Sequence, residues 1–171
     1  DTTGVELPRG DVGEIWLKSD TNMQSYFNLP EATAANLTDG WVHTGDAGYM
    51  DDEGYLYLKD RMKDMVVSGG ENIYPVEVEN ALAQHEAVAD VAVIGVPDDK
   101  FGEALLAFVV LKPGASLTVE EMVAFCREKI AGYKIPRQLQ TIEELPRNPS
   151  GKILKKILRQ PYWQDADRAI S

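Results

Sequence analysis

A single cysteine, Cys126, is present among the 171 residues, so no intrachain disulfide can form and a reducing, cytoplasmic setting is expected. No apolar run approaches the ~20 residues that a membrane-spanning helix requires, so no transmembrane segment is expected. Basic residues are also in the minority, since 17 Lys and Arg stand against 28 Asp and Glu and the net charge is −11. Because nucleic-acid-binding proteins present a basic face, this charge argues against nucleic acid as a partner.

The sequence also lacks a phosphate-binding loop and a zinc-ligand pattern. The chain has no glycine-rich loop of the kind that cradles phosphate groups. Its two histidines, His43 and His85, are far apart in the sequence and show no zinc-ligand spacing, so no metal site is expected. Cys126 lies on an apolar stripe at helical spacing and is expected in the core rather than as a nucleophile.

The residues that are present indicate a globular chain with two parts. Hydrophobic residues make up 44% and charged residues 26% of the composition, which is typical of folded domains. The first part, residues 1 to about 60, is rich in turn and β signals, and Trp41, Tyr55 and Tyr57 are expected to pack in its sheet. Its predicted strands are residues 13–18, 41–43, 47–50 and 55–59, the last two joined by a four-residue hairpin loop.

The second part of the chain alternates between strand and helix signals. Pro75 stands where a first-turn proline belongs and begins a helix predicted to end near Gln84. Thr118 and Glu121 match a capping box at the start of a second helix, with Gly132 as its expected stop. The other predicted elements are strands at residues 65–67, 88–96, 105–111 and 138–142 and a short amphipathic helix at residues 153–159.

An acid and an arginine in the first part are candidates for binding a nucleotide. Asp46 follows Thr44 and Gly45 at the predicted end of a strand, where a carboxylate can accept charge-assisted hydrogen bonds from vicinal ribose hydroxyls. Taken alone, Asp46 is better explained as a turn-capping aspartate. Arg61 lies in a charged run between the two parts, and its guanidinium can fork onto ribose or phosphate oxygens. Taken alone, that run is more simply a solvated linker.

Two glycine-containing segments in the second part are further candidates for contact with a ligand. Glycines within residues 68–71 would let a ligand approach the backbone, although a plain strand-to-helix turn explains them too. Lys152 follows residues 149–151 in a loop that is expected to be exposed, and its ammonium could neutralise charge that builds on a phosphoryl or acyl oxygen. An ordinary lysine ahead of a helix is the alternative reading of Lys152.

In their order and spacing, these segments resemble consecutive motifs of the adenylate-forming acyl-CoA synthetases. The resemblance covers nearly the whole chain, and it is stronger for fatty-acyl and related carboxylate ligases than for other branches. The segments that carry it are residues 13–15 (GEI), 26–28 (YFN), 30–33 (PEAT), 40–46 (GWVHTGD), 60–64 (DRMKD), 68–75 (SGGENIYP), 133–136 (YKIP) and 149–152 (PSGK).

The resemblance implies a two-step reaction. A carboxylic acid, expected to be a fatty acid, attacks the α-phosphate of ATP to give an acyl-adenylate, and the thiol of coenzyme A then displaces AMP. ATP, coenzyme A and Mg²⁺ are therefore implied, with Mg²⁺ held mainly by the missing N-terminal part. By motif, Lys152 would be the catalytic lysine of adenylation, and Asp46 and Arg61 would hold the nucleotide ribose. Lys63 would be the hinge about which the C-terminal domain rotates between the steps. After rotation, the passage for coenzyme A would be formed by Ser68, Gly69, Gly70 and Glu71.

The fold that the resemblance implies is α+β. A small C-terminal domain, with a short mixed sheet flanked by helices, would follow the last β-rich subdomain of a larger N-terminal domain. Residues 1–61 would be the end of that N-terminal adenylation domain, and residues 62–171 the mobile C-terminal domain. Because the phosphate-binding loop and acyl pocket would lie upstream, the fragment alone is expected to be inactive.

Three alternatives remain open. An adenylating enzyme could load its acyl group onto a carrier-protein thiol, although residues 68–75 favour coenzyme A. A luciferase-like oxygenase would share the same motifs. A non-catalytic interaction module on this fold would be expected to lack Lys152 or Asp46, and both are present. The acid itself stays undetermined because the residues that would line its pocket lie upstream.

Overall fold

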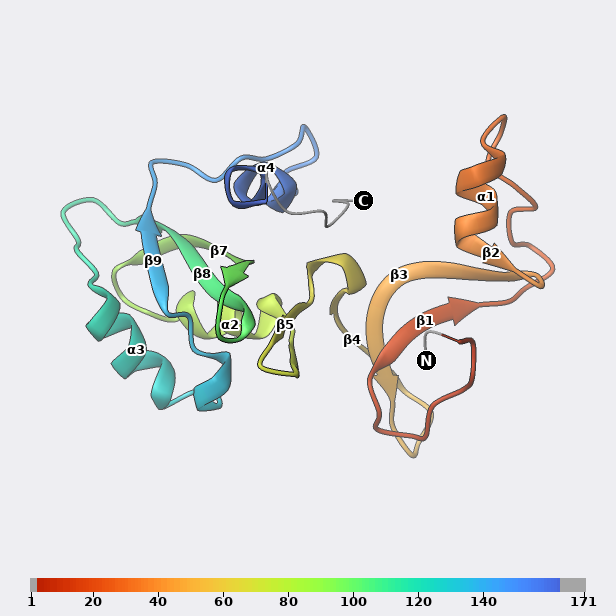
Figure 1. The fold of residues 1–171 in the computed structure, drawn as a ribbon, viewed down its shortest axis with the longest axis horizontal. Helices are drawn as coiled ribbons and strands as arrows, with labels where there is room; N and C mark the ends of the chain where they lie inside the picture. Colours follow the sequence, from red (N-terminus) through yellow and green to blue (C-terminus); the bar gives the residue numbers. More distant parts are fainter. Residues whose placement is uncertain (1–2, 164–171) are drawn as a thin grey trace. The chain divides into compact units, whose positions relative to one another are not determined.

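The computed structural model describes residues 3–163, which form two compact units (Figure 1). Unit 1 ends at Lys63 and unit 2 begins at Asp64. No helix among residues 3–163 is both long enough and apolar enough to cross a membrane.

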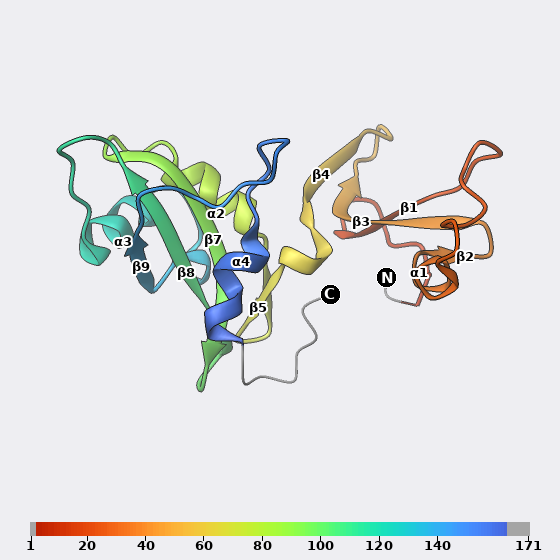
Figure 2. The same cartoon turned by 90° about the horizontal axis from the view of Figure 1, so that it is seen from above.

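Unit 1 is built on a four-stranded antiparallel sheet in which β3 pairs with β1, β2 and β4 (Figure 2). The strand predicted at residues 13–18 is confirmed as β1, and the predicted hairpin is confirmed as β3 and β4. Its loop has five residues rather than four, and helix α1 was not predicted. The elements are β1 (Gly13–Leu17), α1 (Pro30–Asn36), β2 (Leu37–Thr38), β3 (Trp41–Met50) and β4 (Leu56–Arg61).

Strand β3 is one continuous strand where the sequence predicted two. The register of its pairing with β1 shifts between His43 and Ala47, and Gly45 lies inside this stretch with φ +69°. A bulge of this kind bends a strand without ending it, and glycine supplies the left-handed conformation that the bend requires. The prediction that Asp46 ends a strand is therefore wrong, because Asp46 lies in the interior of β3.

Unit 1 buries few of its apolar side chains. Among its described residues, Ala47 is the sole fully buried hydrophobic one, whereas Phe27 is 88% exposed and Leu58 is 69% exposed. The expectation that the aromatic residues pack in the sheet is wrong for Trp41 and Tyr55, which are 41% and 63% exposed. It holds for Tyr57, which is 45% exposed but stacks on Tyr49 of β3 with ring centroids 5.0 Å apart. A sheet with this little core does not account for its own stability.

Unit 2 confirms the predicted α+β class and its short mixed sheet. Four strands run in the order β6-β5-β8-β7 with antiparallel pairing, and β9 pairs parallel to β8. The elements are η1 (Met62–Asp64, which spans the division), β5 (Val66–Ser68), β6 (Glu71–Ile73), α2 (Pro75–Leu82), β7 (Val88–Asp98), β8 (Gly102–Leu111), α3 (Val119–Arg127), η2 (Gly132–Lys134), β9 (Gln138–Thr141), α4 (Lys155–Arg159) and η3 (Gln160–Tyr162).

Helices cover both faces of this sheet, because side chains on β7 and β8 alternate between the two faces. Helices α2 and α3 pack on one face and α4 on the other (Figure 1). The first cluster includes Val91, Val93, Leu105, Ala107 and Val109 with Val78, Leu82, Met122 and Cys126. The second includes Ala92, Ile94, Val96, Leu106 and Phe108 with Leu145 and Leu158.

Several predicted details of unit 2 are confirmed, and others are wrong. Thr118 and Glu121 form the predicted capping box, and Cys126 is fully buried as expected, which raises the pKa of its thiol. Strand β7 continues through Pro97 where a stop was predicted, and in the described sheet β7 is an edge strand, where proline is tolerated. Gly132 does not stop α3, which ends at Arg127; Gly132 begins η2 instead.

Candidate functional site

The register of the β3–β4 hairpin places Asp46 directly opposite Arg61. The Arg61 Nη1 atom lies 3.1 Å from the Asp46 Oδ1 atom, and the two side chains are 46% and 34% exposed. The pair is therefore reachable from solvent, and its carboxylate and guanidinium can both turn toward a ligand with vicinal hydroxyls. Although the sequence nominated each residue separately, strand pairing brings them together.

Hydrogen bonds from β1 support the backbone beside this pair. The Thr44 hydroxyl donates to the Ile15 carbonyl oxygen over 2.8 Å, and the Gly45 N–H donates to the Glu14 carboxylate over 3.0 Å. Glu14 also accepts from the Trp16 indole N–H at 2.8 Å. Glu14 thus fixes the bulge that aims Asp46, a role that sequence reasoning missed because it depends on the β1–β3 register.

The segment Ser68–Glu71 is a tight β-hairpin turn. Ser68 pairs with Glu71, and the two residues between them, Gly69 and Gly70, have φ of +61° and +87°. Two successive residues with positive φ define the two-residue hairpin turn for which glycine is preferred. The strand-to-helix reading of these glycines is therefore wrong, because strand β6 lies between them and α2.

The tip of this hairpin is anchored on one side and open on the other. The Gly69 N–H donates to the Phe101 carbonyl oxygen over 2.8 Å, and a Cβ atom on Gly69 would lie 3.2 Å from the Phe101 ring. A Cβ atom on Gly70 would meet no described atom within 4 Å. The backbone at Gly70 is therefore accessible for close approach by a thin ligand.

Lys152 lies in a loop whose backbone is fixed by Asn148. The Asn148 carboxamide oxygen accepts from the N–H groups of Ser150 and Lys152 at 3.1 and 2.8 Å, and from the Ser150 hydroxyl at 2.8 Å. Arg147 adds a hydrogen bond to the Gly151 carbonyl oxygen at 2.6 Å. Lys152 itself is exposed, as predicted. Asn148 and Arg147 were missed, although an asparagine ahead of Pro-Ser-Gly is a recognisable turn signal.

Lys63 is the last residue of unit 1 and lies in the short helix η1. Asp64, the next residue, forms an ion pair of 3.0 Å with Arg159 of α4. The predicted hinge position thus coincides with the division between the units.

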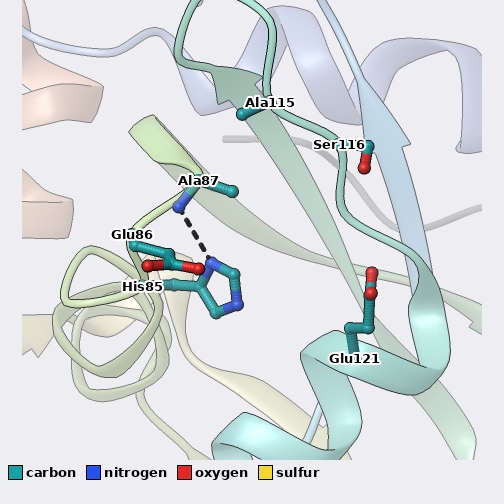
Figure 3. A pocket seen from close by; sticks show the side chains of 6 residues that line it. All are labelled: His85, Glu86, Ala87, Ala115, Ser116 and Glu121. Carbon is teal, nitrogen blue, oxygen red and sulfur yellow. Dashed lines mark hydrogen bonds between the residues drawn. The ribbon is translucent and has the colours of Figure 1, made fainter.

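Unit 2 also has an open surface pocket of about 480 Å³ between the ends of α2 and β8 and the start of α3 (Figure 3). His85 lies in it with its Nδ1 atom accepting from the Ala87 N–H at 3.1 Å. Glu121 also lines it, and the Thr118 backbone and hydroxyl, which donate to its carboxylate, lower its pKa. None of the predicted site residues lines this pocket, which is lined by His85, Glu86, Ala87, Ala115, Ser116 and Glu121.

The predicted residues therefore divide between the units. Asp46, Arg61 and Lys63 belong to unit 1, whereas the glycine hairpin and Lys152 belong to separate elements of unit 2. Across residues 3–163, no three His, Cys, Asp or Glu side chains are grouped so that they could hold a metal ion.

Comparison with known proteins gives consistent matches. Residues 77–152 match the AMP-binding enzyme C-terminal domain. The chain is 51% identical over 158 residues to the 3-[(3aS,4S,7aS)-7a-methyl-1,5-dioxo-octahydro-1H-inden-4-yl]propanoyl:CoA ligase of Rhodococcus jostii, covering 92% of this chain and 31% of that ligase. It is 45% identical over 171 residues to the fatty acid–[acyl-carrier-protein] ligase ScoC of Streptomyces coeruleorubidus, covering 100% and 33%.

Among solved structures, the chain resembles o-succinylbenzoate CoA synthetase (MenE) from Bacillus subtilis in complex with the acyl-adenylate intermediate OSB-AMP. The TM-score is 0.83 at 43% identity, and the match covers 89% of this chain and 31% of that one. The chain thus spans about a third of the length of the relatives that it matches.

Proposed function

We propose a reaction for the whole protein from the family of this chain, which belongs to the adenylate-forming acyl-CoA synthetases and matches the C-terminal portion of their longer members. That protein activates a carboxylic acid with ATP as an acyl-adenylate, releases pyrophosphate, and transfers the acyl group to the thiol of coenzyme A with release of AMP. A fatty acid is the proposed substrate class. The buried, unpaired thiol of Cys126 suits the reducing cytoplasm.

The ion pair between Asp46 and Arg61 is the observation that supports a nucleotide site most directly. We assign its carboxylate to the two ribose hydroxyls of ATP, since charge-assisted hydrogen bonds to a diol suit an exposed aspartate. The Arg61 guanidinium holds the carboxylate in place and offers further N–H donors to ribose or phosphate oxygens.

Lys152 supplies positive charge to the adenylation step. Negative charge builds on the oxygens around phosphorus as the acid attacks, and a positioned ammonium stabilises that charge. The exposed side chain and the loop backbone fixed by Asn148 suit this role, because the ammonium can reach a ligand from a defined base. Mg²⁺ would assist the same step and would be held mainly by upstream residues.

The glycine hairpin serves the thioester step. After a rotation about Lys63, Ser68, Gly69, Gly70 and Glu71 would line the passage through which the thiol arm of coenzyme A enters. The open backbone at Gly70 supports this assignment, because a side chain there would narrow the passage. Exchanging one surface of unit 2 for another lets one site carry out both steps.

A carrier-protein thiol is the second candidate acceptor. It is favoured by the match of all 171 residues of this chain to an acyl-carrier-protein ligase, whereas the higher identity to a CoA ligase favours coenzyme A.

The test uses the full-length enzyme with ATP, a panel of carboxylic acids, and either coenzyme A or an acyl carrier protein. Lys152→Ala is expected to lower acid-dependent exchange of pyrophosphate into ATP on the order of 100-fold, the scale of losing one charge-stabilising donor. Lys156→Ala, which removes an exposed lysine of α4, is the matched control and should retain activity.

The products decide between the candidates. Thioester formed with coenzyme A supports the ligase, and thioester formed solely on the carrier protein moves the assignment to the second acceptor. An oxidised acyl product, as a luciferase-like oxygenase would form, would refute the proposal. Absence of acyl-adenylate with every acid tested would refute it as well.

A further inference from the structure

The guanidinium of Arg159 grips Asp64 at two points. Its Nη1 atom lies 3.0 Å from the Asp64 carboxylate oxygen Oδ1, and its Nη2 atom donates to the Asp64 backbone carbonyl oxygen over 3.2 Å. The two side chains are 14% and 15% exposed, and the residues are 95 positions apart in the sequence. One arginine thus holds both the side chain and the backbone of the first residue of unit 2.

Helix α4 is itself held firmly to the rest of unit 2. At its start, Lys155 forms an ion pair of 2.7 Å with Glu79 of α2, and both side chains are at most 15% exposed. Glu79 also accepts from the Val93 N–H on β7 at 2.7 Å. At its end, Leu158 is buried in the second core cluster. Because α4 is docked in this way, its contacts with Asp64 connect Asp64 to the rest of unit 2.

We propose that Arg159 is a positioning residue that fixes the C-terminal boundary of the hinge. Its two contacts with Asp64 are called the clamp below. With the Asp64 carboxylate and carbonyl both held, the backbone torsions left to change lie at the N–Cα bond of Asp64 and before it. Unit 2, with α4 and the Lys152 loop three residues ahead of it, then turns as one body from that point. This inference rests on the proposed function, because it presumes a rotation between the two half-reactions.

The double contact matters because either contact alone would leave the backbone freer. An ion pair to the carboxylate can persist while the main chain of Asp64 rotates about it, whereas a bond to the carbonyl oxygen fixes the peptide plane that follows Asp64. Lysine at position 159 could form the ion pair but lacks the forked donors that reach both oxygens. The forked geometry of arginine is thus the property that the hinge position requires.

The clamp is tested first without reference to activity, by hydrogen–deuterium exchange on the 171-residue chain. Arg159→Met is expected to raise the exchange rate at residues 64–66 about tenfold, since local opening becomes easier, and Arg159→Lys is expected to raise it less. Lys155→Met is the matched control, because it removes an equally buried ion pair of the same helix that does not involve Asp64. It should leave residues 64–66 within about twofold of the original rate, because the buried Leu158 still docks α4 on the sheet.

Two results would overturn the clamp. One is unchanged exchange at residues 64–66 in Arg159→Met; the other is an equal rise there in Lys155→Met, which would indicate general loss of α4 docking. Should Arg159→Met not fold, Arg159→Lys against the unchanged chain gives the same comparison.

Its consequence is tested in the full-length enzyme by measuring the half-reactions separately. Arg159→Met is expected to slow adenylation about tenfold, because the loop that holds Lys152 leads directly into α4. It is expected to leave thioester formation from added acyl-adenylate within about twofold, because the glycine hairpin is held by strand pairing. Equal losses in both steps would refute the positioning role. If the enzyme without substitutions forms no adenylate, the proposed function is refuted. The hydrogen–deuterium exchange data would still test whether Arg159 holds Asp64.

Discussion

Asp46 illustrates how an exposed ion pair can matter for binding and little for stability. Its carboxylate and the Arg61 guanidinium are about 34% and 46% exposed, so solvent screens their attraction. Surface pairs of this kind contribute at most about 1 kcal/mol to folding. The geometry instead keeps both groups ordered and accessible, as a binding site for a polar ligand requires.

Asp46→Asn is accordingly expected to raise the KM for ATP about tenfold or more in the full-length enzyme, because the amide loses the charge-assisted hydrogen bonds to ribose. The unfolding temperature should change by less than about 2 °C, the shift expected from a small loss at the surface. Steady-state kinetics and a thermal melt check the two parts. Asp52→Asn, in the exposed hairpin loop, is the control for loss of one charge. An unchanged KM in Asp46→Asn would contradict the nucleotide assignment.

Asp46, Arg61 and Lys152 could be predicted as site residues from the sequence, because the segments that flank them resemble motifs of the acyl-CoA synthetases. The sequence did not reveal the roles of Glu14, although residues 13–15 form one of the matched segments, or of Asn148. Both act by accepting hydrogen bonds from backbone N–H groups that reach them after a strand has paired or a loop has closed. Such roles depend on contacts between a side chain and main-chain N–H groups elsewhere in the fold, which leave little trace in residue type.

At the scale of elements, local rules were reliable where the signal lay within one turn. The capping box at α3 is an example: the Thr118 side chain accepts from the Glu121 N–H at 3.2 Å, and Glu121 accepts from the Thr118 N–H at 2.8 Å. Strand extents were less predictable, because Gly45 within β3 and Pro97 within β7 look like stops until bulges and edge positions are known.

The Glu121 cap is expected to make the stability of unit 2 depend on pH in the acidic range. The Thr118 backbone and hydroxyl lower the pKa of Glu121 below its ordinary value of 4.5. The stabilising contribution is therefore fully present above pH 4.5 and is lost as the pH falls through the lower pKa of the folded state. Thermal melts of Glu121→Ala and the unchanged chain should differ at pH 7 and converge near pH 3. A difference that stays constant over this range would show that the carboxylate charge contributes nothing.

At the scale of the whole molecule, the two units differ in how completely their apolar side chains are buried. Unit 2 has two clusters of buried residues on opposite faces of its sheet. Unit 1 exposes Phe27, Tyr55 and Leu58 and, within its described residues, fully buries Ala47 as its one hydrophobic side chain. The sequence suggested this contrast through the short, open-edged strands of its first part. It did not show which side chains remain exposed, because exposure depends on how the strands pair and bend in the fold.

This contrast predicts that the two units differ when produced separately. Residues 64–171 are expected to unfold in one cooperative transition, because a domain of this size with two filled clusters can bury enough apolar surface to offset its conformational entropy. Residues 1–63 are expected to show no cooperative transition, since about 60 residues with so few buried side chains fall below that threshold. Far-UV circular dichroism melts and the dispersion of amide NMR signals measure both outcomes. A sharp melt of residues 1–63 alone would contradict this prediction and would show that the sheet of unit 1 stabilises itself despite the exposed aromatic and leucine side chains of β4.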